Sequence, residues 1–240
     1  MHLPPGPPWD LPVAAAPLAF VDLEMTGLDV AQDRVVEVCI DRVCGGVRQG
    51  FLTSLVHPGE RRCGAAAASV HGIDAALLGG APPFEALAAE VASLLDGAVV
   101  VAHAAVWDVR FLDAEFKRAG RKLEVEHWLD TLALARRAFA FRSYSLDSLC
   151  RELQIERGQA HRAESDVGAL RGVFERCVAA LAPASVRDLW EVRAGERKAR
   201  QAIVEACEAA AEHGAPVLVT YRPARRAPEA MPMVLLEVRA

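Results

Sequence analysis

The stretch Leu18–Leu28, with the sequence LAFVDLEMTGL, constrains the fold more than any other part of the chain. It is a short apolar run that contains two carboxylates and stops at Gly27, which is typical of a buried strand leading into a turn. Side chains alternate along a strand, so Asp22 and Glu24 point to the same face. Two carboxylates withdrawn from water on one face repel each other, and a divalent metal ion would remove this cost. A strand end that merely reaches solvent, with Glu24 as a cap or ion-pair partner, explains these residues equally well.

The bulk composition is that of a globular protein, because 52% of the 240 residues are hydrophobic and 25% are charged. This length suits one domain of ordinary size plus an appendage, or two small domains. No apolar run reaches the roughly 18–20 residues of a membrane span, so we expect no membrane partner. Four prolines precede Asp10, and no basic region does. We therefore expect residues 1–17 to form an extended tail rather than a signal peptide.

The net charge limits which ligands can be expected, and the cysteine content indicates the cellular compartment. The six cysteines form no C-x-x-C pair, which predicts reduced, structural cysteines in a cytoplasmic protein. The formal net charge is −5, whereas a protein that grips long duplexes through phosphates is usually basic. Either nucleic acid is not the ligand, or the protein holds only a short end while metal ions balance the phosphate charge.

Hydrophobic periodicity and turn residues predict an α/β domain with a mixed sheet. We expect an antiparallel meander of three strands, followed by helices that alternate with a buried strand. The predicted strands are 18–22, 33–44, 51–57 and 99–102, with a hairpin through Gly45 and Gly46. The predicted helices are 84–95, 106–119, 128–138, 145–153 and 161–181, and residues 65–78 form a loop with a short helix.

The C-terminal part is predicted to be a small helix-plus-hairpin appendage. Residues 185–213 have the pattern of an amphipathic helix, and residues 216–222 and 233–239 read as two strands. Two strands are not stable alone, so they must pack on something else. The predicted organisation is therefore a tail at 1–17, a main domain at 18–182 and an appendage at 183–240, which serves as a docking element for a polymerase or a second copy of the chain.

Two further carboxylates and a histidine belong with the first pair. Asp108 follows the buried strand 99–102 on the first turn of a helix, and Asp166 lies near the start of the last helix of the main domain. His161 precedes Asp166 by five residues, which on an ideal helix is a rotation of about 500°, or about 140° net. The two side chains would then face different ways. His161 must lie in the loop before the helix if it works beside Asp166.

The order D-x-E, H-x4-D, H-x4-D resembles that of the DEDDh exonucleases, which are 3′→5′ nucleases. This superfamily includes the proofreading epsilon subunit of bacterial DNA polymerase III, ribonuclease T and oligoribonuclease. The resemblance covers about residues 18–180 and includes DRVVEV, the VHP and HGI motifs, and Asp130-Thr131-Leu132. It implies a ribonuclease H-like fold.

The resemblance also implies a mechanism with two Mg²⁺ or Mn²⁺ ions. Carried over to this chain, Asp22 bridges both ions, while Glu24 and Asp166 complete the ion that holds the attacking water. Asp108 serves the second ion, and His161 takes the proton from the water. Hydrolysis of the last phosphodiester bond then releases a 5′-nucleotide from the 3′ end of single-stranded DNA or RNA.

The same resemblance implies where the end of the substrate lies. The backbone at Met25, Thr26 and Gly27 approaches the terminal sugar, and Leu28 or Met25 stacks against or wedges the last bases. His103 either touches the substrate or caps its strand, and the sequence favours neither role.

Two departures from the family pattern stand out: Ala104 replaces an Asn, and Trp107 replaces a Phe. The motif VDLEMTGLD looks most like oligoribonuclease, whereas VVAHAAVWDVRFL and HGI look more like the epsilon branch. The leading hypothesis is a 3′→5′ exonuclease that acts on single-stranded DNA. The alternatives are an exoribonuclease for short RNA and a non-catalytic module that binds 3′ ends or docks on a polymerase. The intact five-residue set argues against the last.

Overall fold

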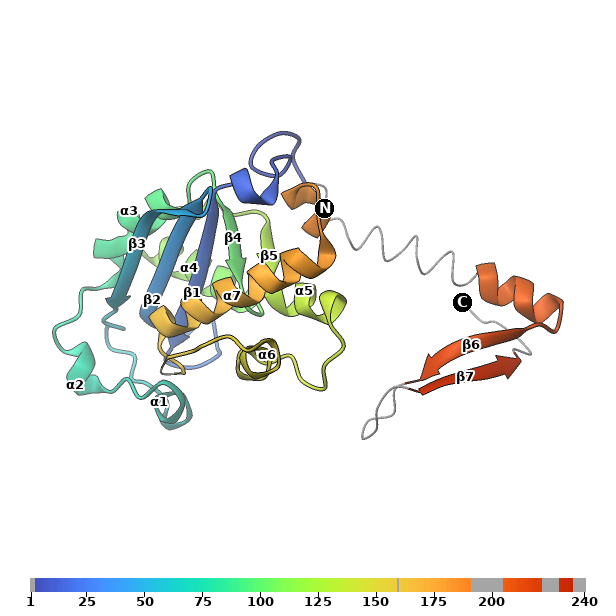
Figure 1. The fold of residues 1–240 in the computed structure, drawn as a ribbon. Helices are drawn as coiled ribbons and strands as arrows, with labels where there is room; N and C mark the ends of the chain where they lie inside the picture. Colours follow the sequence, from blue (N-terminus) through green and yellow to red (C-terminus); the bar gives the residue numbers. More distant parts are fainter. Residues whose placement is uncertain (1–2, 159, 191–204, 222–228, 235–240) are drawn as a thin grey trace. The chain divides into compact units, whose positions relative to one another are not determined.

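The computed structural model describes all residues except 1–2, 159, 191–204, 222–228 and 235–240 (Figure 1). The chain forms two compact units, Met1–Leu189 and Trp190–Ala240. The division falls after Leu189 rather than after residue 182 as expected. Val186 and Leu189 are buried, and the backbone amide of Val186 donates a hydrogen bond to the carbonyl of Leu11. These contacts explain why residues 183–189 belong to the first unit.

The first unit is built on a five-stranded mixed sheet with the order β3-β2-β1-β4-β5. Its strands are β1 (Leu18–Met25), β2 (Val35–Cys44), β3 (Val47–Leu55), β4 (Val99–Ala102) and β5 (Trp128–Asp130). β1, β2 and β3 pair antiparallel, whereas β4 is parallel to β1 and to β5. The mixed sheet, the meander and the hairpin at Gly45 and Gly46 are confirmed, although β3 begins four residues earlier than expected.

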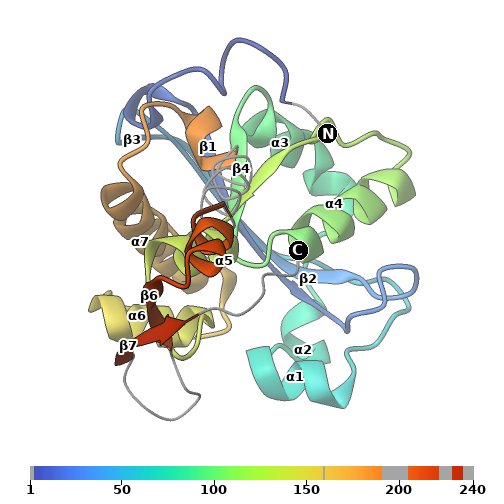
Figure 2. The ribbon, with the colours of Figure 1, turned by 90° about the vertical axis from the view of Figure 1, so that its right-hand side faces the viewer.

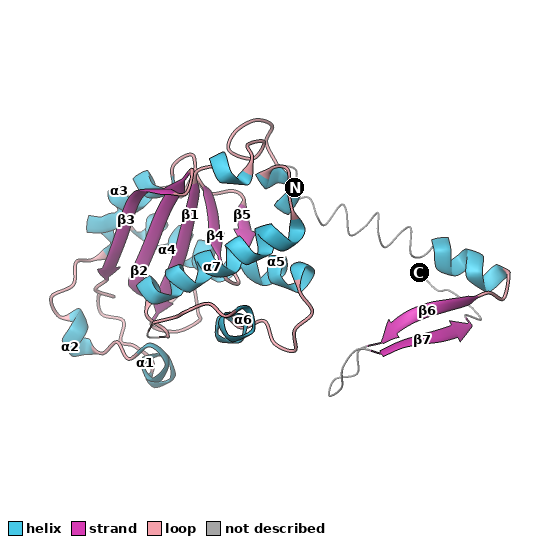
Figure 3. Cartoon of the chain, viewed as in Figure 1, coloured by secondary structure: helices cyan, strands magenta, loops and turns pink. Residues whose placement is uncertain are grey.

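Helices cover both faces of this sheet (Figures 2 and 3). α3 (Phe84–Leu95) and α4 (Val106–Arg118) lie on one face, and α7 (Ala163–Leu181) lies on the other, beside α5 (Thr131–Ala138) and α6 (Leu146–Leu153). Two short helices, α1 (Ala65–His71) and α2 (Ala75–Leu78), follow β3. A 3-10 turn, η1 (Val13–Ala15), precedes β1.

Alternation along β1 decides which layer the acidic pair faces. Val21 packs in the core cluster shared with α3 and α4. Phe20 points the other way, and its ring centroid lies 5.5 Å from that of Phe174 on α7. Because side chains alternate along a strand, Asp22 and Glu24 lie on the face covered by α7.

The segment expected to be helical from Trp128 begins instead as a strand. Residues Trp128–Asp130 form β5, which pairs in parallel with β4, and Leu129 is buried. The side chain of Asp130 then accepts a hydrogen bond from the backbone amide of Leu132, so the helix begins at Thr131. A three-residue strand is too short to show a period of two.

Residues before β1 do not form the extended tail expected from their prolines. Leu3 and Trp9 are buried, because packing in the first unit removes these large apolar side chains from water. The backbone amide of Arg187 donates to the carbonyl of Trp9, which joins this segment to the chain just before Leu189.

The second unit contains helical residues 205–212 and an antiparallel pair, β6 (Pro216–Tyr221) and β7 (Glu229–Val234). β7 begins before the expected residue 233 and includes Pro232, which is tolerated because each strand of a two-stranded sheet has an unpaired edge. Residues 235–239 and much of the expected helix lie outside the described residues. No helix that the structure describes has the length and apolarity needed to cross a membrane.

A tight turn at Ala104 joins β4 to α4 and so aims the first turn of α4. Ala104 has φ +58°, in the left-handed region, and its backbone amide donates to Asp130 Oδ1 at 2.9 Å. A residue with a Cβ is strained there by roughly 1–2 kcal/mol, whereas Gly is not and Asn is more tolerant.

We expect Ala104→Gly and Ala104→Asn to stabilise the protein by about 0.5–1 kcal/mol, because both residues adopt a positive φ more readily than Ala. Chemical denaturation measures the change. The neighbouring substitution Ala105→Gly is the control: Ala105 is buried in the right-handed helical region, so Gly there should destabilise. Loss of stability in all three variants would contradict the strain at Ala104.

Candidate active site

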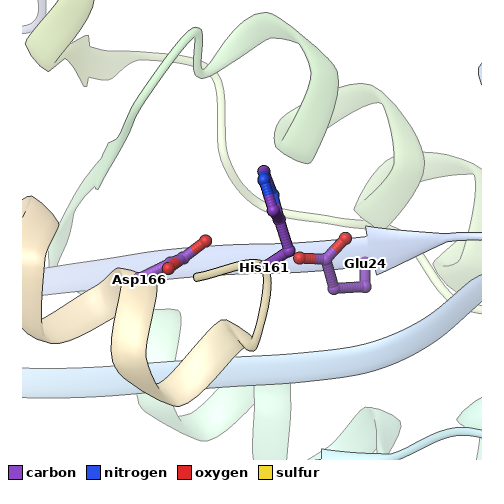
Figure 4. Close-up of side chains that lie close together, drawn as sticks. All are labelled: Glu24, His161 and Asp166. Carbon is purple, nitrogen blue, oxygen red and sulfur yellow. The ribbon is translucent and has the colours of Figure 1, made fainter. Parts of the chain in front are cut away.

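Three of the expected site residues lie together at one end of the sheet. Glu24, His161 and Asp166 each offer a ligand atom, and these atoms all lie within 4.8 Å of one another (Figure 4). Glu24 comes from the end of β1 and Asp166 from the first turn of α7. α7 begins at Ala163, so His161 lies in the preceding loop, with φ +58°. This placement lets His161 and Asp166 face the same point, as the sequence argument required.

Asp22 and Asp108 belong to the same electrostatic group. Asp108 is buried on the first turn of α4, and the backbone amide of Leu23 hydrogen-bonds its carboxylate, which ties α4 to β1. Burial raises the pKa of Asp22 well above its ordinary range, and the charges of Asp108, Asp166 and Glu24 raise it further. The structure therefore brings all five expected residues to one end of the sheet.

Burial and mutual repulsion raise the pKa of the other carboxyl groups too. Burial, followed by the charge of Asp166, raises the pKa of Glu24 to about 7. Burial, assisted by the charges of Asp130 and Glu24, raises the pKa of Asp108 to about 8. A group of hard oxygen donors that resists holding several negative charges fits a divalent cation such as Mg²⁺ or Mn²⁺.

Arg157 is a member of the site that the sequence did not single out. Its Nε lies 2.9 Å from Asp166 Oδ1, and its guanidinium also pairs with Asp147 of α6. Burial raises the pKa of Asp166, and the nearby charge of Arg157 opposes that shift. The sequence held no signal for this contact, because Arg157 belongs to no motif and its partners are set by the packing of α6 against α7.

The loop after β1 is fixed by hydrogen bonds around Thr26 and Asp33. Thr26 is buried, and its hydroxyl donates to Asp33 Oδ1 at 2.8 Å. A Cβ at Gly27 would lie only 2.4 Å from Asp33 Oδ2, so only glycine fits. Leu28 is 68% exposed, whereas Met25 is half-buried at the end of β1. Of these four expected contact residues, Leu28 offers a side chain to solvent, whereas the backbone amide and carbonyl of Thr26 already bond Arg34 and Gly64.

His103, the fifth expected substrate contact, is engaged by the protein. Its Nδ1 lies 3.0 Å from Thr131 Oγ1, and its Nε2 lies 3.0 Å from the carbonyl oxygen of Tyr144. Burial lowers the pKa of the His103 ring, so the neutral form is favoured. A carbonyl can only accept, so Nε2 carries the proton and donates to the carbonyl of Tyr144. Of the two roles left open, these contacts support the structural one.

Comparison with known proteins agrees with this geometry. The RNase_T family model, described as exonuclease, matches residues 19–174. The chain belongs to this 3′→5′ exonuclease family.

Several relatives are proteins of DNA metabolism. The chain is 30% identical to the PolC-type DNA polymerase III of Thermotoga maritima over 177 residues, which is 74% of the chain but 13% of that protein. It is 34% identical to the 3′-5′ exonuclease DinG of Bacillus subtilis, covering 64% of the chain and 17% of the relative. It is 32% identical to the DNA polymerase III subunit epsilon of Rickettsia prowazekii, covering 65% and 71%. The chain thus spans less than a fifth of the first two relatives.

Solved structures share the fold. A structure of exonuclease X in complex with 5′ overhanging duplex DNA matches with a TM-score of 0.58 and 25% identity, covering 72% of this chain and 98% of that one. A zinc-bound complex of E. coli exonuclease I with single-stranded DNA matches with a TM-score of 0.62 and 21% identity, covering 68% and 40%. The ribonuclease H-like exonuclease fold expected from the sequence is therefore confirmed.

The raised pKa values of Glu24 and Asp108 predict how stability depends on pH when metal is removed. Their unfolded values are about 4, so the folded protein binds protons more tightly than the unfolded chain. This contribution is complete below about pH 4 and is lost as the pH rises through 7 to 8. In EDTA, we expect the melting temperature to fall between pH 5.5 and 8.5 by a few degrees, equivalent to about 1 kcal/mol or more.

Asp108→Asn should flatten this fall, because one of the titrating carboxyl groups is removed. Asp113→Asn is the matched control on the same helix, since Asp113 is partly exposed and pairs with Lys117. A wild-type melting temperature that is constant over this range in EDTA would show that the carboxylates are not buried against one another.

Proposed function

We propose that this protein is a metal-dependent 3′→5′ exonuclease that releases 5′-mononucleotides from single-stranded DNA ends. The observation that carries the proposal is the meeting of four carboxylates and His161 at the end of β1, beside the exposed side chain of Leu28. Such a site can hold a phosphodiester only if cations offset the charge of the carboxylates. The DNA polymerase III relatives support DNA as the substrate.

The four carboxylates have the role of cation ligands in this proposal. Asp22, Glu24, Asp108 and Asp166 would hold two Mg²⁺ or Mn²⁺ ions, since Mg²⁺ and Mn²⁺ favour carboxylate oxygens. When bound, the ions neutralise the phosphate and make water a better nucleophile. The negative charge of the free site would otherwise repel the substrate.

His161 has the role of general base. It accepts a proton from the attacking water while the water oxygen forms a bond to phosphorus and the bond from phosphorus to O3′ of the preceding nucleotide breaks. The leaving O3′ takes a proton from solvent. The released nucleotide therefore keeps its 5′-phosphate.

The loop after β1 would receive the end of the substrate. The backbone at Met25, Thr26 and Gly27 approaches the terminal sugar, and Leu28 packs against the last base. His103, which is held by Thr131 and Tyr144, has a structural role in this proposal. Loose apolar contact at Leu28 suits any base, so we expect little sequence preference.

An exoribonuclease for short RNA is the second candidate, because VDLEMTGLD is similar to the first motif of oligoribonuclease. The two candidates share every catalytic step and differ in the tolerance of a 2′-hydroxyl at the terminal sugar. A module that only binds 3′ ends is a weaker candidate, because it has no need for the complete catalytic set.

The proposal predicts that, with Mg²⁺ or Mn²⁺, the protein shortens a 5′-labelled single-stranded DNA from its 3′ end and releases 5′-mononucleotides. A matched RNA should be degraded more slowly. Gel electrophoresis follows the ladder and chromatography identifies the product. Faster degradation of the RNA would favour the second candidate.

Asp22→Asn should reduce this activity to that of the EDTA-treated protein, because one carboxylate ligand is lost. Asp113→Asn should leave it unchanged. Activity that survives both EDTA and Asp22→Asn would contradict the metal-dependent mechanism.

The C-terminal unit has the proposed role of a docking element for a polymerase or a second copy of the chain. Met233 and Val234 are exposed apolar residues of β7 in this unit, and such surface is unfavourable in water. All six cysteines are free, which fits the reducing cytoplasm that we propose as the location of the protein.

A chain that ends at Leu189 should hydrolyse a short oligonucleotide within a few-fold of the full chain, because all five proposed catalytic residues lie in the first unit. Its oligomeric state or solubility should change if residues 190–240 dock. Mononucleotide release measures hydrolysis by both chains, and light scattering measures their oligomeric state. Loss of hydrolysis in a folded truncated chain would show that the second unit contributes to the site.

A further inference from the structure

Glu37 is a buried carboxylate next to the site that the proposed mechanism does not use. It lies on β2 directly opposite Glu24 of β1, on the same face of the sheet, and is only 3% exposed. Like charges directly opposite each other in an antiparallel pair are destabilising. A buried carboxylate also requires partners for its oxygens. Something must therefore hold Glu37 in place.

The partners of Glu37 are the two residues that follow His161. The guanidinium of Arg162 contacts both carboxylate oxygens, with Nη2 at 2.8 Å and Nε at 3.1 Å from Oε1 and Nε at 3.2 Å from Oε2. The backbone amide of Ala163 donates to Oε2 at 3.0 Å. Arg162 is the N-cap of α7 and makes no capping bond with its own side chain. Glu37, which lies on β2, therefore provides the side-chain cap at the start of α7.

His161 lies immediately before this clamp in an unfavourable backbone conformation. Its φ of +58° is in the left-handed region, which costs a residue with a side chain roughly 1–2 kcal/mol. Such a conformation persists only where its surroundings enforce it. On one side the backbone of His161 hydrogen-bonds Asp166, and on the other Glu37 fixes Arg162 and Ala163.

We infer that Glu37 is a positioning residue for His161. Its ion pair with Arg162 and its bond to Ala163 hold the loop so that a ring nitrogen of His161 stays within 4.8 Å of carboxylate oxygens of Glu24 and Asp166. Glu37 is outside the group of potential metal ligands that the described residues form, so its effect reaches the chemistry through the loop. This inference rests on the proposed role of His161 as general base.

A double-mutant cycle with Glu37→Gln, His161→Ala and the double variant tests the inference. Gln has nearly the same shape but cannot form the ion pair, so kcat should fall roughly ten- to hundredfold through misplacement of the base, with KM nearly unchanged. His161→Ala should lower kcat by about 10²–10⁴-fold. The double variant should be no slower than His161→Ala, because Glu37 then has nothing left to position.

Multiplication of the two effects in the double variant would overturn the inference, because Glu37 would act independently of His161. An unchanged kcat in Glu37→Gln would overturn it as well. A loss of less than tenfold in His161→Ala would instead remove the general base from the proposed function, and the inference with it. The single variants therefore distinguish the two failures.

Asp41→Asn is the matched structural control. Asp41 lies on the same strand and the same face, is equally buried, and pairs with Arg48 and with Arg171 of α7. Its loss should lower the melting temperature without lowering kcat. Arg162→Lys, which keeps the charge but loses the two-pronged contact, should resemble Glu37→Gln. Calorimetric titration with Mn²⁺ should show unchanged metal affinity in Glu37→Gln, and weaker affinity there would overturn the inference.

Discussion

Repulsion among carboxylates that meet at one end of the sheet is the constraint on which the rest of this domain depends. Asp22 and Glu24 come from β1, Asp108 from α4 and Asp166 from α7, so three elements hold the charges together. None of these elements would bring them this close without the apolar packing behind them, such as the contact of Phe20 with Phe174. The apolar core holds the carboxylates in an arrangement that is unfavourable until cations bind to them.

The contact of α7 with the sheet combines buried apolar residues with two arginines that pair with carboxylates of β2. Near its start, Arg162 pairs with Glu37 of β2, and two turns later Arg171 approaches Asp41 of the same strand at 3.7 Å. Beyond these pairs, Phe174 packs on β1. Buried ion pairs contribute less to stability than to specificity of register, because a one-turn slip would remove Arg162 from Glu37 and Arg171 from Asp41. The register of α7 in turn sets the position of Asp166.

Much of the site could be predicted from residue spacing. The alternation of side chains along a strand placed Asp22 and Glu24 on one face of the sheet. The rotation between residues five apart on a helix placed His161 in the loop before α7. β5 could not be predicted because three residues are too few to show a period of two. The burial of Trp9 could not be predicted because the prolines around it favour an extended, solvated segment. The sequence does contain a signal for Glu37, because a charged residue within the apolar run VVEVCI indicates a buried carboxylate that requires a partner. Arg157 offered none, since its partners depend on how α6 meets α7.

Hydrogen bonds join the segment before β1 to residues 186–187. They bear on how a domain of this kind can be connected to the rest of a protein. Val186 and Arg187 join Leu11 and Trp9, so the beginning and the end of the first unit meet in one seam. This seam lies before β1 begins, whereas Asp22 and Glu24 lie toward the other end of that strand (Figure 1). Neither end of the unit passes the end of the sheet where the proposed metal ligands lie. A domain whose two ends lie together can be inserted into unrelated chains without covering its proposed site.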